Sequence, residues 1–187
     1  MKTGANTQHK QIYIVVSQTG TILSRILKRI TGAEYNHASI SFSPDLLTMY
    51  SFGRMHPYNP VWGGLVKESP NSGTFKRFSG TRVVVLSITV SQEKYLKMLG
   101  MVSAMYEHRK KYHYNYLGLL FAGLSINLRV KRSYYCSEFV YDVLTTANVK
   151  GVNRLSLITH PADFLQLPGA HVVYRGKLCE YSYSSVF

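Results

Sequence analysis

A cysteine and a histidine occur in two short segments about a hundred residues apart, NHASI at residues 36–40 and YCSEFV at residues 135–140. The first segment is typical of the start of a strand, and the second of the first turn of a helix. A thiol becomes a nucleophile when it is held as thiolate, and a helix N-terminus and a nearby imidazole both favour that form. We therefore expect Cys136 and His37 to form a catalytic dyad.

The cysteine belongs to an apolar stripe whose members recur at helical spacing: Cys136, Phe139, Val140, Val143, Leu144 and Ala147. This pattern predicts an amphipathic helix with the thiol on its inner face. Ser133 is a suitable N-cap, which would put Cys136 in the first turn, beside unpaired N–H groups and the positive end of the helix dipole. Glu138 lies off the stripe, so we expect it on the outer side of the helix or paired with a basic residue. A purely structural cysteine is the alternative, because free cysteine is among the most buried residue types.

The histidine begins a predicted strand that has Ser39 and Ser41 on the face of His37 and apolar residues on the opposite face. A single histidine on a strand is usually structural or lies at the surface. Together with an inward cysteine at a helix start, it supplies the two elements that a Cys–His dyad needs.

In this order and context, residues 36–40 and 135–140 resemble the His strand and the Cys helix of the circularly permuted NlpC-type branch of papain-like cysteine hydrolases, the YiiX-like group. In that branch the His strand precedes the Cys helix. The resemblance implies an α+β, permuted papain-like fold, in which a small antiparallel sheet or half-barrel packs against helices. It also implies attack by Cys136 on an amide or ester carbonyl, with His37 as base and then acid, and with the Cys136 backbone N–H among the oxyanion donors.

The residue that orients the imidazole departs from the family pattern. Relatives carry a polar side chain, often acidic or histidine, on the strand after the His strand, and Ser51 is the matching residue here. A hydroxyl can fix a tautomer, but it stabilises an imidazolium less than a carboxylate does. Glu68, which we expect in the following loop, is the alternative orienting residue.

The rest of the chain predicts one domain over residues 1–187, with a flexible N-terminus at residues 1–10. Residues 54–80 are rich in Pro, Gly, Asn and Ser and predict a long loop with one short strand at 65–68, and residues 114–126 predict a buried segment. Tyr112, Tyr114 and Tyr116 alternate, which suits either packing or the lining of a substrate groove. The other expected elements are strands at 11–18, 36–43, 47–53, 82–90, 171–175 and 178–183 and helices at 19–31 and 91–108.

Composition allows two kinds of function. The chain has 187 residues, 45% of them apolar, and a net charge of +13, which attracts anionic partners such as acidic lipid, cell-wall polymer or nucleic acid. The basic residues are scattered and no nucleic-acid-binding signature is present, which argues against specific recognition of nucleic acid. A thiol hydrolase acting on a peptide, a cell-wall peptide or a lipid-linked amide or ester is the first hypothesis. A catalytically weak or inactive module that binds an anionic partner through its basic surface is the alternative.

Cofactors and metals are not expected. His108 and His113 have no carboxylate or cysteine at ligand spacing, and the two cysteines are too few for a disulfide framework. A Cys136–Cys179 bridge would abolish the nucleophile. With no hydrophobic signal region and no apolar stretch long enough to span a bilayer, the sequence predicts a protein that is cytoplasmic or peripheral to a membrane.

Overall fold

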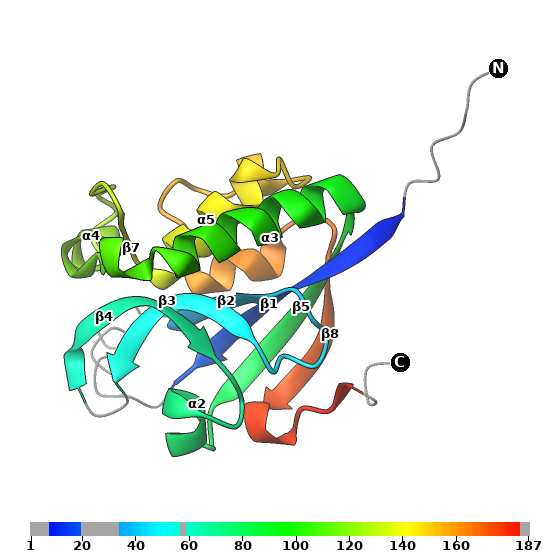
Figure 1. The fold of residues 1–187 in the computed structure, drawn as a ribbon, viewed down its shortest axis with the longest axis horizontal. Helices are drawn as coiled ribbons and strands as arrows, with labels where there is room; N and C mark the ends of the chain where they lie inside the picture. The colour runs from blue at the N-terminus through cyan, green and yellow to red at the C-terminus, as the bar shows by residue number, and fades with distance from the viewer. Residues whose placement is uncertain (1–7, 20–33, 57–58, 184–187) are drawn as a thin grey trace.

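The computed structural model describes residues 8–19, 34–56 and 59–183, which form an α+β fold around an antiparallel sheet (Figure 1). The sheet has six strands in the order β4-β3-β2-β1-β5-β8. This confirms the predicted class and the antiparallel pairing. The strands are β1 (His9–Gln18), β2 (His37–Ser41), β3 (Met49–His56), β4 (Asn59–Glu68), β5 (Arg82–Ser91) and β8 (Ala170–Lys177).

The helices divide between the two faces of the sheet. In Figure 1, α3 (Gln92–Glu107) and α5 (Cys136–Thr146) lie on one side and the short α2 (Gly73–Arg77) on the other. Strand β1 shows why both faces are covered: Ile12 and Ile14 join the core under α3 and α5, whereas Tyr13 and Val15 join a second cluster with Phe75 of α2. A strand with apolar residues at successive positions must be buried on both sides.

Smaller elements connect these layers. Strands β6 (His113–Tyr114) and β7 (Ser133–Tyr134) form a parallel pair, and α4 (Tyr116–Ala122) lies between them in sequence. Four 3₁₀ helices are present in the described residues: η1 (Arg109–Lys111), η2 (Val152–Arg154), η3 (Pro161–Gln166) and η4 (Leu178–Glu180). Ser91 caps α3 by accepting a hydrogen bond from the Lys94 backbone N–H, as its sequence predicts.

The predicted loop at 54–80 is wrong over most of its length, although the short strand predicted at 65–68 is confirmed as the end of β4. Strand β3 continues to His56, β4 covers residues 59–68, and α2 follows. Pairing with β3 and packing against tyrosines outweigh the low strand propensity of glycine. A side chain at Gly63 would place its Cβ 2.7 Å from both Tyr114 Cβ and Tyr116 Oη, so glycine is what lets the two rings lie against β4.

Three further predictions need correction, and one cannot be judged. His9 and Lys10 pair with β5, so the ordered chain begins before residue 11. The strand predicted at 178–183 begins instead with η4, which carries an exposed Cys179. The segment at 114–126 is not uniformly buried, since several of its leucines are exposed. The predicted helix at 19–31 falls almost wholly outside the described residues. No helix in the described ranges is long and apolar enough to cross a membrane.

Candidate active site

Cys136 is the first residue of α5 and is almost fully buried. Its Sγ lies 4.0 Å from the carbonyl oxygen of Asn36, the residue that precedes β2. The helix begins one residue after the N-cap Tyr135, and not after Ser133, which belongs to β7. The first N–H groups of a helix have no partner within it, so the thiol lies where backbone donors and the dipole favour negative charge.

Glu138 explains why the helix begins at this point. Its Oε2 accepts a hydrogen bond of 3.3 Å from the Tyr135 backbone N–H, a reciprocal cap at the helix start. Its other oxygen lies 3.5 Å from Arg129 Nε. The predicted pairing with a basic residue is therefore present, but the predicted outer position is wrong, because the carboxylate is buried.

The imidazole of His37 lies at the start of β2, and Glu68 at the end of β4 holds it from two strands away. The ring Nε2 lies 3.0 Å from Glu68 Oε1 and 3.1 Å from Oε2, and each side chain is only 12% exposed. The carboxylate thus reaches the ring from a strand and not from a loop. Because Nε2 faces the carboxylate, Nδ1 is the ring nitrogen left to exchange a proton with a thiol.

The carboxylate lies in a polar cluster on the side of the sheet that faces α2. Ser39 Oγ donates a hydrogen bond of 2.6 Å to Glu68 Oε2. A Cβ at Gly53 would lie 3.3 Å from both Glu68 Oε1 and Ser51 Oγ, so the glycine gives these groups room. Ser51 is buried and, within the described residues, makes no hydrogen bond of ordinary geometry. The nearby Ser51 hydroxyl helps to lower the pKa of Glu68. The residue that contacts the His37 ring is Glu68 and not Ser51.

Electrostatics favour a charged imidazole. Burial lowers the pKa of His37, but the negative charge of Glu68 and hydrogen bonds to the Cys136 and Glu68 side chains outweigh it and raise the pKa to about 10. Burial likewise raises the pKa of Glu68, and the charge and hydrogen bond of His37, with the Ser39 bond, bring it below its ordinary value. At neutral pH the geometry therefore supports an imidazolium with a carboxylate on one side and the sulfur of Cys136 on the other.

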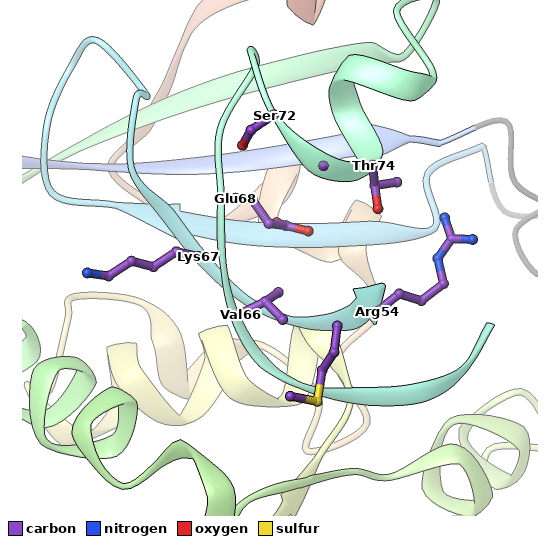
Figure 2. Close-up of a pocket in the computed structure, with 8 residues that line it drawn as sticks. Arg54, Val66, Lys67, Glu68, Ser72 and Thr74 are labelled. Atoms are coloured by element: carbon purple, nitrogen blue, oxygen red, sulfur yellow. The ribbon is translucent and has the colours of Figure 1, made fainter. Parts of the chain in front are cut away.

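Of two cavities in the described structure, the smaller one is lined by a residue of this site. This cavity, of about 90 Å³, is lined by Glu68 and by the start of α2, and Figure 2 shows Ser72 and Thr74 across it from the carboxylate. Lys67 extends away from this cavity, and its Nζ lies over the Tyr106 ring on the other side of the sheet. This volume can hold water but is too small for a peptide or lipid substrate.

The second cavity, of about 430 Å³, has a size suited to a small ligand. It is lined by Met55, Trp62, Gly63, Arg109, Lys110, Tyr112, His113, Tyr114 and Tyr116. Burial and then the negative charge of Cys136 raise the pKa of Tyr114, one of its lining residues. All three of the alternating tyrosines line this cavity.

The structure thus brings Cys136, His37 and Glu68 together and leaves Ser51 behind the carboxylate. Both cysteines are free thiols, one buried and one exposed. Sequence reasoning missed the contact of Ser39 with Glu68, although strand alternation already put Ser39 on the face of His37. In the described ranges, no group of three or more His, Cys, Asp or Glu residues could hold a metal ion.

Comparisons with protein-family models, with curated proteins and with solved structures gave no match for this chain. Arguments about its function therefore rest on the geometry of the site.

Proposed function

We propose that this protein is a cysteine hydrolase with a permuted papain-like arrangement, which cleaves an amide or ester bond with Cys136 as nucleophile. The observation that best supports the proposal is that Cys136, at a helix start, lies against the residue before His37, while Glu68 contacts the His37 ring. A thiol at a helix start, an imidazole whose pKa that thiol helps to raise and a carboxylate on the ring Nε2 are the parts that nucleophilic acyl transfer needs.

In this mechanism the thiolate of Cys136 attacks the carbonyl carbon and forms a tetrahedral intermediate. In this proposal the backbone N–H of Cys136 stabilises the oxyanion, as the family resemblance implies. The imidazolium of His37 then gives its Nδ1 proton to the leaving amine or alcohol, and the C–N or C–O bond breaks to leave a thioester. Neutral His37 next takes a proton from water as the water oxygen attacks the thioester, and the C–S bond breaks to release the acid and restore the Cys136 thiolate and the His37 imidazolium.

Glu68 remains ionised throughout and has a positioning role. Its two contacts with Nε2 fix the ring orientation and stabilise the imidazolium form. Ser39 contacts both groups, because its Oγ donates a hydrogen bond to Glu68 Oε2 and lies 3.3 Å from His37 Nε2. The family resemblance suggested Ser51 as the residue that orients the imidazole. In this proposal the acidic Glu68 has that role instead.

Alkylation tests the thiol without knowledge of the substrate. We expect iodoacetamide to modify Cys136 at mildly acidic pH, faster than Cys179, with the sites resolved by peptide mass spectrometry. His37→Ala should slow the reaction of Cys136 near neutral pH and leave that of Cys179 unchanged. A Cys136 that reacts only above about pH 8, with or without His37, would contradict the proposal.

Hydrolysis is tested with panels of peptides, simple esters and phospholipids. We expect turnover that Cys136→Ala abolishes and that Cys179→Ala, the matched control, leaves intact. Activity that survives Cys136→Ala would refute the assignment of the nucleophile.

The alternative, a non-catalytic module that binds an anionic partner, has its own support in the segment from residue 109 to residue 134. This segment holds six Lys or Arg residues and no Asp or Glu. Binding that is steeply salt-dependent, together with an inert Cys136, would favour this second function. The two functions are compatible, since the basic segment borders the larger cavity through Arg109 and Lys110.

A further inference from the structure

Helix α4 exposes large aliphatic residues and buries small ones. Leu117, Leu120 and Leu124 fall within one helical stripe that continues just past the end of the helix, and they are 61%, 52% and 62% exposed. Gly118 and Ala122 are the residues that the helix buries. A surface helix of a globular domain normally buries its leucines and exposes polar residues. Here the aliphatic face points away from the protein.

The exposed leucines are not what holds α4 in place. Asn115 caps the helix by accepting a hydrogen bond of 2.8 Å from the Gly118 N–H, and its Nδ2 donates one of 2.9 Å to the carbonyl of Leu128 in the following loop. Gly118 leaves room for this cap, because a Cβ there would collide with the Asn115 side chain. The leucines are therefore available to an external partner.

Basic residues border this aliphatic face. Arg109, Lys110 and Lys111 form η1, and Lys131 and Arg132 lie beside them in space, because the His113 N–H donates a hydrogen bond of 3.0 Å to the Arg132 carbonyl. Among the described residues, none of these five side chains is in an ion pair with a carboxylate. Positive charge therefore lies next to the apolar surface with no acidic residue in the same segment.

The rim of the larger cavity lies at the same end of the molecule. Trp62 of β4 is 68% exposed, and it lines the cavity together with Tyr116 at the start of α4. Figure 1 shows β4 and α4 close to one another at one end of the sheet. An exposed indole and the basic residues Arg109 and Lys110 thus line a cavity at the end of the molecule that carries α4.

We propose that this region, the α4 surface (Trp62, Leu117, Leu120 and Leu124 with the basic residues 109–111 and 131–132), docks on an anionic lipid bilayer. Aliphatic side chains bordered by Lys and Arg match the apolar interior and the negative headgroups of such a bilayer, and indole rings favour the boundary between them. A nucleic acid would use the basic residues but would leave the leucines exposed to water. This inference does not depend on catalysis by Cys136. If the proposed hydrolase activity also holds, docking would present the cavity to lipid-linked amides or esters.

Vesicle binding tests the proposal directly. Trp62 is the only tryptophan in the chain, so its emission, excited apart from tyrosine, reports on the α4 surface. We expect a blue shift and quenching by brominated acyl chains with vesicles that contain about 30% phosphatidylserine, and little response to pure phosphatidylcholine. Each basic residue near the surface should strengthen binding by about fivefold, and binding should weaken as salt is raised.

Matched variants distinguish vesicle binding through the α4 surface from non-specific adsorption of the protein to vesicles. Replacing Leu117, Leu120 and Leu124 with serine should weaken vesicle binding by about tenfold or more, because each removes a large aliphatic group from the lipid contact. The control replaces Leu47, Leu96 and Leu157, which are also more than half exposed but lie elsewhere, and should change binding by less than about twofold. Replacing Lys110 and Lys131 with glutamine should weaken binding more than the same change at Lys76 and Lys97.

Circular dichroism and the alkylation rate of Cys136 confirm that each variant is folded. Equal vesicle binding by the two leucine variants, or no binding to anionic vesicles at all, would overturn the proposal. So would binding to a DNA duplex that is tighter than binding to vesicles and insensitive to the leucine changes, which would identify a nucleic-acid partner instead.

Discussion

Glu68 at the end of β4 and Glu138 in the first turn of α5 are both buried carboxylates in the neighbourhood of the thiol, and burial affects them with opposite results. The pKa of Glu68 is lowered from its ordinary value, because attraction to His37 and its hydrogen bonds outweigh the cost of burial. For Glu138 the cost of burial prevails over the Tyr135 N–H and Arg129, and the pKa rises to about 7.

The difference lies in the cation. His37 is almost as enclosed as Glu68 and contacts both of its oxygens, so little water weakens the attraction. Arg129 is 41% exposed, lies 3.5 Å from Glu138, and shares its charge with Asp142 at 3.0 Å. A buried carboxylate therefore remains ionised where its partner is buried with it, and tends towards neutrality where the partner is solvated.

The largest expected effect comes from Glu68→Gln. Without the carboxylate, the pKa of His37 should fall from about 10 towards its ordinary 6.5. The imidazolium then loses its proton at a lower pH than in the unchanged protein. We expect hydrolysis to slow on the order of 10²- to 10⁴-fold, and the alkylation rate of Cys136 near pH 7 to fall. The pH profile of alkylation measures this directly.

Glu138→Gln is the matched control for that experiment, because it neutralises the other buried carboxylate. It should leave the alkylation profile nearly unchanged. Identical profiles for the two glutamine variants would mean that Glu68 has no special relation to the dyad.

Stability should change in opposite directions in these two variants. The pKa of Glu138 is raised from 4.5 to about 7 in the folded protein, so ionising this carboxyl destabilises the fold. The loss of folding free energy is absent below pH 4.5 and grows as pH rises through 7. Glu138→Gln should raise the free energy of unfolding by about 1–2 kcal/mol at pH 8 and change it little at pH 4.5.

Glu68→Gln should instead destabilise the fold at neutral pH. The lowered pKa of Glu68 gives a contribution that is present above pH 4.5 and is lost as pH falls further. The raised pKa of His37 gives a stabilising contribution that is fully present below pH 6.5 and is lost as pH rises through about 10. Urea titrations at several pH values measure both variants, and a stabilising Glu68→Gln at pH 7 would contradict the comparison.

The smallest effects distinguish the two serines near Glu68. Ser39→Ala removes a hydrogen bond of 2.6 Å to a charged group and should cost about 1–2 kcal/mol. Ser51→Ala should cost less than about 0.5 kcal/mol, since its hydroxyl makes no hydrogen bond of ordinary geometry in the described structure. Urea denaturation at pH 7 compares them, and NMR titration should show a larger rise of the Glu68 pKa in Ser39→Ala than in Ser51→Ala, because the Ser39 hydrogen bond lowers that pKa more strongly. Equal costs would mean that Ser51 supports Glu68 as strongly as Ser39 does.

Sequence patterns located β5, α3 and α5 because those elements are regular. Strand β5 is a continuous apolar run, and α3 and α5 repeat their apolar residues at helical spacing. For the same reason the position of Cys136 in the first helical turn was predictable. The observed N-cap, Tyr135, lies two residues after the predicted Ser133. Its backbone N–H donates to Glu138, which is buried although the apolar stripe assigned it to the outside of the helix.

The failures occur where distant packing outweighs local composition. Residues 59–68 contain two glycines and a proline, yet they form β4 because β3 pairs with them and Tyr114 packs on Gly63. The position of Glu68 next to His37 follows from that pairing and has no local signal. Likewise, an apolar run at 114–126 predicts burial, and only the structure shows that the small residues of α4 face inward.

The strand order has a consequence for how the protein folds. Strand β1 lies between β2 and β5, so it must pair with a segment that follows closely and with one that is made much later in the chain. The thiol then comes from a helix that follows both. Contacts between residues far apart in sequence form slowly, because a long loop must close before they are gained. A nascent or partly folded chain would therefore lack the contact of His37 with Glu68, and Cys136 would lie beside Asn36 only once the whole sheet is assembled.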